Sequence, residues 1–211
     1  MYKQILIILD HKDIFMTFRE NWYSTQQAHH IAELATTMRD KGMCMEIGCW
    51  EGFSTYYIAN AIYPTQLLCV DTWQGSIAEN VNHISVIEAE KRDVYRQFRE
   101  NMQALTKGNY LTFVYDWRGI IPILKEAGYK FSFVHIDAEH DYQSVYDCIE
   151  MLYPLMVHGG IMCGDDFTSA NIARTDLGGG VEKAVRDFFG AKNIEIHSAN
   201  NAWWIYVNEN I

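Results

Sequence analysis

The stretch that decides the fold is FVHIDAEHDYQSVYDCIEMLYPLMVHGGIMCGDDF, residues 133–167. It shows a β-type apolar run, an amphipathic helical pattern and a second β-type run, which predicts two parallel strands joined by a crossover helix. The first strand ends at Asp137 and the second at Asp165 and Asp166. Because parallel strands end at the same edge of a sheet, where open α/β sheets bind ligands, we expect these carboxylates to lie close together.

Three carboxylates gathered at one edge repel one another unless a positive charge lies between them. A hard divalent cation with oxygen ligands answers this, so Asp137, Asp165 and Asp166 are candidate metal ligands. Any one of them alone would be explained as a turn or cap residue. His140 follows Asp137 by three residues. A lone histidine is usually an ordinary residue, but beside these acids its imidazole, which titrates near neutrality, is a candidate general base.

The alternation of strand and helix extends along the chain from Met43. Such alternation predicts a parallel sheet wrapped by helices. After a last helix, two β-type runs are joined by the short turn 199–201, which permits an antiparallel hairpin only. The predicted fold is therefore α/β, a Rossmann-like doubly wound sheet that is mostly parallel with an antiparallel last strand. The expected strands are 43–49, 66–71, 110–116, 131–137, 160–166, 193–198 and 202–207, and the expected helices are 53–63, 86–105, 119–128, 144–156 and 181–190.

The N-terminal region is predicted to be an extension, residues 1–42, on a single domain of residues 43–211. It contains one helix over 24–41, with Ser24 or Thr25 as N-cap and Gly42 as the stop. For the first 23 residues the pattern allows an extra strand or helix, packed over the site or against a partner subunit.

A glycine turn follows the first strand of the domain in MEIGCWEGFST, residues 45–55. Gly48 and Gly52 let the backbone approach a ligand, and Ser54 adds a hydroxyl. The spacing departs from the dinucleotide pattern G-x-G-x-x-G, and Glu46, placed in the turn, suits a cationic ligand better than a pyrophosphate. A turn without a ligand is the alternative. The candidate cofactor residues here are Glu46, Gly48, Cys49, Gly52 and Ser54.

Two later strand ends add candidate cofactor contacts. Asp71 ends the second strand, where an acid accepts hydrogen bonds from ribose hydroxyls, unless it only caps the next helix. Trp73 is placed to stack beside an adenosine, or simply to pack. At the end of the third strand, Asp116 and the Trp117 backbone face the expected adenine position, and an N-cap role for Asp116 is the alternative.

Composition bounds the class of protein. The chain of 211 residues carries a net charge of −10, which argues against non-specific binding to nucleic acid or an anionic membrane. Its five cysteines are scattered without a C-x-x-C pair, as expected for buried thiols in a reducing compartment. The first apolar run is too short for a membrane span and lacks a signal-peptide cleavage site. We expect a cytoplasmic protein.

The segment 133–167, together with MEIGCWEGFST and VDTWQGS (70–76), resembles the class I S-adenosylmethionine-dependent methyltransferases. Within them the chain is most similar to metal-dependent sugar O-methyltransferases of the macrocin O-methyltransferase type, and cephalosporin hydroxylase-like proteins share the pattern. The resemblance covers about residues 25–207 and implies that Glu46, Gly48 and their neighbours hold the methionine portion. It further implies that Asp71 holds the ribose, that the three strand-end aspartates bind magnesium, and that His140 is the base.

The resulting expectation is magnesium-dependent transfer of a methyl group to a hydroxyl of a small polyhydroxylated acceptor, such as a sugar. Two alternatives stay open: a nicotinamide-dependent oxidoreductase, and a non-catalytic nucleotide- or metal-binding protein of the same fold. The N-terminal region departs from the family and leaves the acceptor open. Self-association into a homo-oligomer is compatible with the sequence. Candidate acceptor-pocket residues are Trp22, Tyr23, His29, His30 and the segment 167–180.

Overall fold

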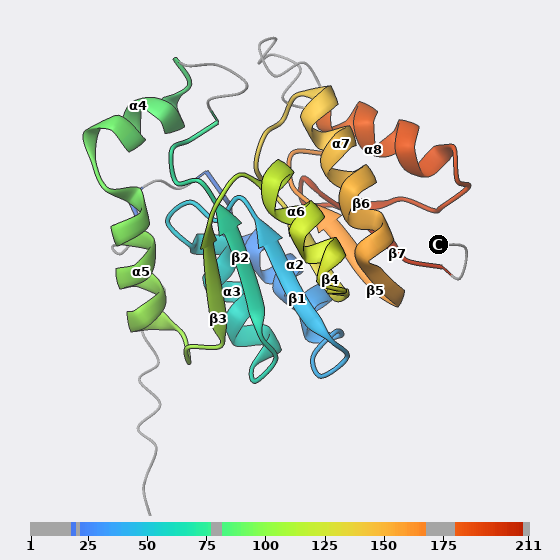
Figure 1. Ribbon diagram of the computed structural model, residues 1–211, viewed down its shortest axis with the longest axis horizontal. Helices are drawn as coiled ribbons and strands as arrows, with labels where there is room; N and C mark the ends of the chain where they lie inside the picture. Colours follow the sequence, from blue (N-terminus) through green and yellow to red (C-terminus); the bar gives the residue numbers. More distant parts are fainter. Residues whose placement is uncertain (1–17, 20–21, 77–81, 168–179, 209–211) are drawn as a thin grey trace, which may run out of the picture.

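The computed structural model describes residues 18–19, 22–76, 82–167 and 180–208, which form a seven-stranded sheet between layers of helices (Figure 1). The strand order is β3-β2-β1-β4-β5-β7-β6. Strands β1 to β5 pair in parallel, whereas β7 pairs antiparallel with both β5 and β6. The predicted fold class is confirmed. The strands are β1 (Met43–Ile47), β2 (Leu67–Asp71), β3 (Tyr110–Val114), β4 (Phe131–Ile136), β5 (Met156–Gly164), β6 (His197–Ala199) and β7 (Ala202–Tyr206).

Helices cover both faces of this sheet. In Figure 1, α6, α7 and α8 lie in front of the strands, and α2 and α3 lie behind them. Buried side chains form two clusters that correspond to these two faces. The helices are α2 (Thr25–Thr36), α3 (Phe53–Ile62), α4 (Ile84–Lys91), α5 (Val94–Leu105), α6 (Trp117–Glu126), α7 (Tyr142–Leu152) with the 3₁₀ turn Tyr153–Leu155, and α8 (Gly180–Gly190).

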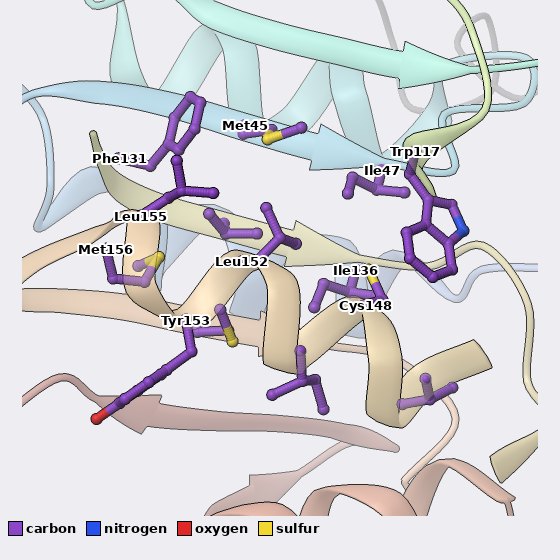
Figure 2. Close-up of a cluster of buried hydrophobic side chains, with 14 of the residues drawn as sticks. Met45, Ile47, Trp117, Phe131, Ile136, Cys148, Leu152, Tyr153, Leu155 and Met156 are labelled. Carbon is purple, nitrogen blue, oxygen red and sulfur yellow. The ribbon is translucent and has the colours of Figure 1, made fainter. Parts of the chain in front are cut away.

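The core on the front face is apolar from strand to helix. Figure 2 shows Met45 and Ile47 of β1 and Ile136 of β4 facing Cys148 and Leu152 of α7. Side chains on both faces of the central strands are buried, which explains why their sequences are mostly apolar, with Glu46, Ser132 and His135 as buried polar exceptions. The strand ends at the carboxyl edge are thereby held in a fixed arrangement beneath any ligand.

Several predicted boundaries are wrong, including the start of the strand expected over 160–166, which begins at Met156. The helix expected over 86–105 is two helices, because Asp93 lies between them and caps α5 through the backbone amide of Arg96. The N-terminal helix ends at Thr36, not at Gly42, and turns connect it to β1. The strand expected over 193–198 is confined to His197–Ala199, since the residues before it connect α8 to the sheet.

Helix α2 joins the N-terminal region to the rest of the protein. Ser24 is the N-cap, as expected, and forms a reciprocal capping box with Gln27. The apolar face of α2, including Ala28 and Ile31, packs against α3 behind the sheet. No helix in the described ranges is long and apolar enough to cross a membrane.

Candidate functional site

A cavity of about 780 Å³ lies along the carboxyl edge of the sheet. It is lined by residues at the ends of the five parallel strands, among them Gly48, Asp71, Asp116, Asp137 and Asp165. The strand order reverses between β1 and β4, so this edge is the topological switch point where α/β sheets bind ligands. The volume is in the range of small-molecule and cofactor sites.

The glycine turn after β1 brings the backbone close to the next strand. Gly48 has φ of +83°, and a Cβ atom there would lie 1.9 Å from the carbonyl oxygen of Asp137. Only glycine fits such a position. The turn and the end of β4 are therefore in direct contact, and both line the cavity.

Asp71 clamps this turn from the end of β2. Its Oδ2 accepts hydrogen bonds from the amides of Cys49 (2.7 Å) and Trp50 (2.8 Å), and its Oδ1 accepts one from the amide of Trp73 (2.6 Å). Burial raises the pKa of Asp71, against the effect of these three amides. The side chain also lines the cavity. It does not cap the next helix, because His83 is the N-cap of α4.

Glu46 is not in the turn, where the sequence placed it. It lies within β1, is fully buried and does not line the cavity. Its Oε1 accepts a hydrogen bond from the Ser54 hydroxyl (2.6 Å) and lies 3.1 Å from Nδ1 of His135, its neighbour on β4. Nε2 of His135 in turn lies 3.2 Å from the Tyr23 hydroxyl. Glu46 is therefore connected to the cavity wall through the hydrogen bonds of Ser54 and of His135 with Tyr23.

The buried hydrogen-bond series Glu46–His135–Tyr23 contains a histidine whose pKa is raised. Burial alone would lower the pKa of His135, but the hydrogen bond and the charge of Glu46 outweigh it, so the pKa is raised. Burial also raises the pKa of Tyr23, as do the charges of Asp165 and Asp137. Tyr23 lines the cavity, so this series links the cavity wall to the interior of the sheet.

Two predicted cofactor residues, Trp73 and Gly52, do not line the cavity. The Trp73 ring is buried against Tyr95 and Phe98, and its Nε1 donates to the carbonyl of Trp50. Packing, the alternative reading of Trp73, is what the structure shows. Gly52 is the N-cap residue of α3, with φ of +91°, and does not line the cavity, because its Cβ direction faces the core. Cys49 and Ser54 do line it.

The third strand end lies where the sequence placed it. Asp116 and Trp117 both line the cavity, and Asp116 is the N-cap of α6, so the N-cap role is confirmed and a contact with adenine stays a prediction. Glu139, which sequence reasoning missed, joins them. It accepts hydrogen bonds from the Trp117 indole (2.7 Å) and from Arg118 (2.8 Å).

The strand-end carboxylates converge as predicted. Ligand atoms of Asp137, His140 and Asp166 lie within 4.8 Å of one another. Nε2 of His140 is 3.1 Å from Asp166 Oδ2 and 3.9 Å from Asp137 Oδ1. Asp165 lies beside this group but deeper, with 6% of its surface exposed. Asp166 has φ of +57°, a strained conformation for a residue other than glycine and a frequent feature of functional sites.

Negative charge accumulates at this edge. Burial, and then the charges of Asp137 and Asp166, raise the pKa of Asp165 well above its usual value. Two side-chain amides that no sequence motif singles out contact the same carboxylates. Gln27 Nε2 donates to Asp165 Oδ1 (2.8 Å), and Asn201 Nδ2 donates to Asp165 Oδ1 (3.2 Å) and to Asp166 Oδ1 (3.1 Å). Only their proximity in three dimensions identifies them.

Of the candidate acceptor residues, Trp22 and Tyr23 line the cavity. His29 and His30 do not, since their rings pack against Tyr57 and Trp204. Most of the segment 167–180 lies outside the described residues, as do residues 1–17.

The sheet order, the glycine turn after β1 and the acid at the end of β2 define a class I methyltransferase fold. Residues 45–167, more than half of the chain, match the family model described as "Methyltransferase domain". The chain belongs to this methyltransferase family. A search of curated protein sequences finds no match.

Solved structures agree on the fold. An O-methyltransferase from Bacillus cereus in complex with SAH has a TM-score of 0.68 at 15% identity, covering 97% of this chain and 94% of that one. TomG from Streptomyces achromogenes is an O-methyltransferase of tomaymycin synthesis, solved in complex with SAM. Its TM-score is 0.64 at 17% sequence identity, and the match covers 96% of this chain and 92% of that one. CalS11, a TDP-rhamnose 3′-O-methyltransferase of calicheamicin biosynthesis, has a TM-score of 0.57 at 12% sequence identity, and the match covers 94% of this chain and 81% of that one.

Proposed function

We propose that the protein is an S-adenosylmethionine-dependent O-methyltransferase that uses a divalent cation, magnesium by preference, and methylates a hydroxyl of a small polyhydroxylated acceptor. The observation that carries the proposal is the convergence of Asp137, Asp166 and His140 beside the glycine turn of a methyltransferase-family domain. Structural or packing roles do not require these three groups to meet at the open end of a ligand-sized cavity.

The donor set fits a hard cation. Asp137, Asp165 and Asp166 offer carboxylate oxygens, which Mg²⁺ prefers. The raised pKa of Asp165, caused by burial and then by the two neighbouring carboxylates, marks an excess of negative charge that a cation would neutralise. When bound, the ion would lower the pKa of an acceptor hydroxyl and orient its oxygen.

The residues around the glycine turn fit the nucleoside. Gly48, Cys49, Asp71, Asp116 and Trp117 all line the cavity. In this proposal the backbone of Gly48 and Cys49 would face the cofactor, Asp71 would hold the ribose, and Asp116 and Trp117 would contact the adenine. The cofactor would supply an electrophilic methyl group on a sulfonium. Asp71 holds the turn in shape through two of its amides, those of Cys49 and Trp50, so it acts on cofactor binding even before any contact with a ribose.

His140 is the proposed base. Its imidazole is 18% exposed at the cavity and lies within reach of both carboxylate partners, so Asp137 and Asp166 can orient it. His140 takes the proton from the acceptor hydroxyl as the oxygen forms its bond to the methyl carbon and the carbon–sulfur bond breaks. Holding the reacting oxygen near the methyl group supplies much of the rate acceleration.

The acceptor class is proposed from a protein of the same fold. CalS11, which shares the fold, is a TDP-rhamnose 3′-O-methyltransferase, and a sugar offers the adjacent hydroxyls that a cation can hold. Aromatic side chains Trp22 and Tyr23 form part of the wall near α2.

We further propose a cytoplasmic protein, in keeping with its five free, buried cysteines. Self-association has its best support in edge strand β3, where Leu111, Phe113 and Val114 are exposed.

The test is transfer of labelled methyl from S-adenosylmethionine to a panel of sugars and catechols, with and without a chelator. We expect the chelator and Asp166→Ala to abolish transfer while cofactor binding, followed by calorimetry, changes little. Asp147→Ala, on the surface of α7, is the matched control and should retain activity. Full transfer in chelator without added metal would overturn the role of the cation.

A further inference from the structure

We propose that the side-chain amides of Gln27 and Asn201 are positioning residues for the metal, which fix the Asp165–Asp166 pair in the geometry that binds the ion. This inference rests on the proposed function, because it concerns the same cation. The carboxylates belong to the segment that matches the family model, residues 45–167, whereas both amides come from outside it. Gln27 belongs to α2, and Asn201 to the β6–β7 hairpin.

The hairpin places Asn201 opposite the two acids. Ala199 pairs with Ala202, so Asn200 and Asn201 form a two-residue turn, with φ of +53° and +68°. Positive φ at both positions is the signature of a type I′ turn, which favours asparagine and glycine. Gly164 pairs with Trp203, and the amide of Phe167 donates to the carbonyl of Asn201 (2.8 Å). The register therefore brings Asn201 alongside the residues that follow β5.

The Asn201 amide spans both carboxylates. Its Nδ2 donates to Asp165 Oδ1 (3.2 Å) and to Asp166 Oδ1 (3.1 Å). One amide group thus holds together two adjacent carboxylates that would otherwise repel each other. The other oxygen of Asp166, Oδ2, lies 3.1 Å from Nε2 of His140.

The amide of Gln27 donates to the same oxygen of Asp165 as Asn201 does. Its Oε1 accepts the hydrogen bond of the Ser24 amide (2.9 Å) in the capping box, which fixes the orientation of the amide group. Nε2 then points at Asp165 Oδ1 (2.8 Å). Gln27 and Asp165 are 8% and 6% exposed, so this contact is shielded from water. A buried anion needs such donors.

Together the two amides hold Oδ1 of Asp165, whose carboxylate also accepts a hydrogen bond from the backbone amide of Asp166. Hydrogen bonds to ligating carboxylates set their orientation, and the loss of such a partner typically weakens metal binding about 10- to 100-fold. The N-terminal helix and the last hairpin therefore contribute to metal affinity without contacting the ion.

The experiment uses the full-length protein, freed of metal by a chelator, and titrates it with Mn²⁺ alone, following free Mn²⁺ by electron paramagnetic resonance. Asn201→Gly removes the amide and keeps a residue that the turn favours. Asn200→Gly makes the same change one residue away. We expect Asn201→Gly to weaken Mn²⁺ binding about 10- to 100-fold and Asn200→Gly to leave it unchanged.

A second pair tests the helix. Gln27→Met keeps the length of the side chain and removes the donor to Asp165, and Gln26→Met, exposed on the same helix, is the control. The expected result is again a selective loss of Mn²⁺ affinity in Gln27→Met. The Tm of each metal-free variant separates this loss from a loss of folding.

Each outcome has a definite meaning. Equal Mn²⁺ affinity in Asn201→Gly and Asn200→Gly, whether both unchanged or both weakened, would overturn the positioning role while leaving the metal site in place. Failure of the unsubstituted protein to bind Mn²⁺ would overturn the proposed cation itself, and the positioning role with it. A selective loss in Asn201→Gly and Gln27→Met supports the inference.

Discussion

Replacing Asp71 with asparagine tests the clamp on the glycine turn. The carboxylate accepts three backbone hydrogen bonds, from Cys49, Trp50 and Trp73, at 2.6–2.8 Å. Asparagine has one oxygen and one NH₂ group, so it can keep the two bonds at Oδ2 only by directing its NH₂ at the amide of Trp73. One buried amide then loses its acceptor, and the remaining two bonds lose the help of the charge.

The size of the effect follows from these contacts. A buried amide left without an acceptor costs about 1–3 kcal/mol, and exchanging a charged for a neutral acceptor costs about 1 kcal/mol in total for the two remaining bonds. Asp71→Asn should therefore lower the free energy of unfolding by about 3 kcal/mol at neutral pH. The measurement is urea unfolding followed by circular dichroism.

Asp93→Asn is the matched control. Asp93 caps α5 through a single backbone amide at 2.8 Å in an exposed position. Asparagine is as good an N-cap as aspartate, so this change should have almost no effect on stability. Equal unfolding free energies for Asp71→Asn and Asp93→Asn would refute the clamp.

Three further predictions concern Gly48→Ala, Tyr23→Phe and the pH dependence of the Asp71→Asn effect. Gly48→Ala should destabilise the fold by about 3 kcal/mol or more and abolish calorimetric binding of the cofactor, because the new methyl meets the Asp137 carbonyl. Tyr23→Phe should cost about 1 kcal/mol of unfolding free energy by removing the hydroxyl near His135, and an unchanged midpoint would contradict this. Burial raises the pKa of Asp71, so the folded protein binds this proton more tightly than the unfolded chain does. The stability advantage over Asp71→Asn should therefore be largest at low pH and shrink as pH rises above about 4, and a constant difference would contradict the raised pKa.

The sheet and the meeting of its strand-end acids could be predicted from sequence because both follow from backbone periodicity. Residues that end parallel strands must share an edge, whatever their side chains do. The same rule put Asp71 and Asp116 at the cavity. The turn at 199–201 was also predictable, because a short connection leaves only a hairpin.

Side-chain direction was not predictable in the same way. Glu46, expected in the turn, lies within β1 one residue before its end, and the alternation of side chains directs it to His135 on β4. Trp73 was assigned to the cofactor from its position near a strand end, but its ring packs on α5. Gln27 and Asn201 lie far from the acids in sequence, so only the folded chain shows their contacts.

Calorimetric titration of the metal-free protein with S-adenosylmethionine, and separately with NAD, tests the central claim most directly. A methyltransferase site predicts saturable binding of S-adenosylmethionine at one site per chain and no measurable binding of NAD. Gly48→Ala should remove the binding signal. Saturable binding of NAD without binding of S-adenosylmethionine would contradict the account and favour an oxidoreductase on the same fold.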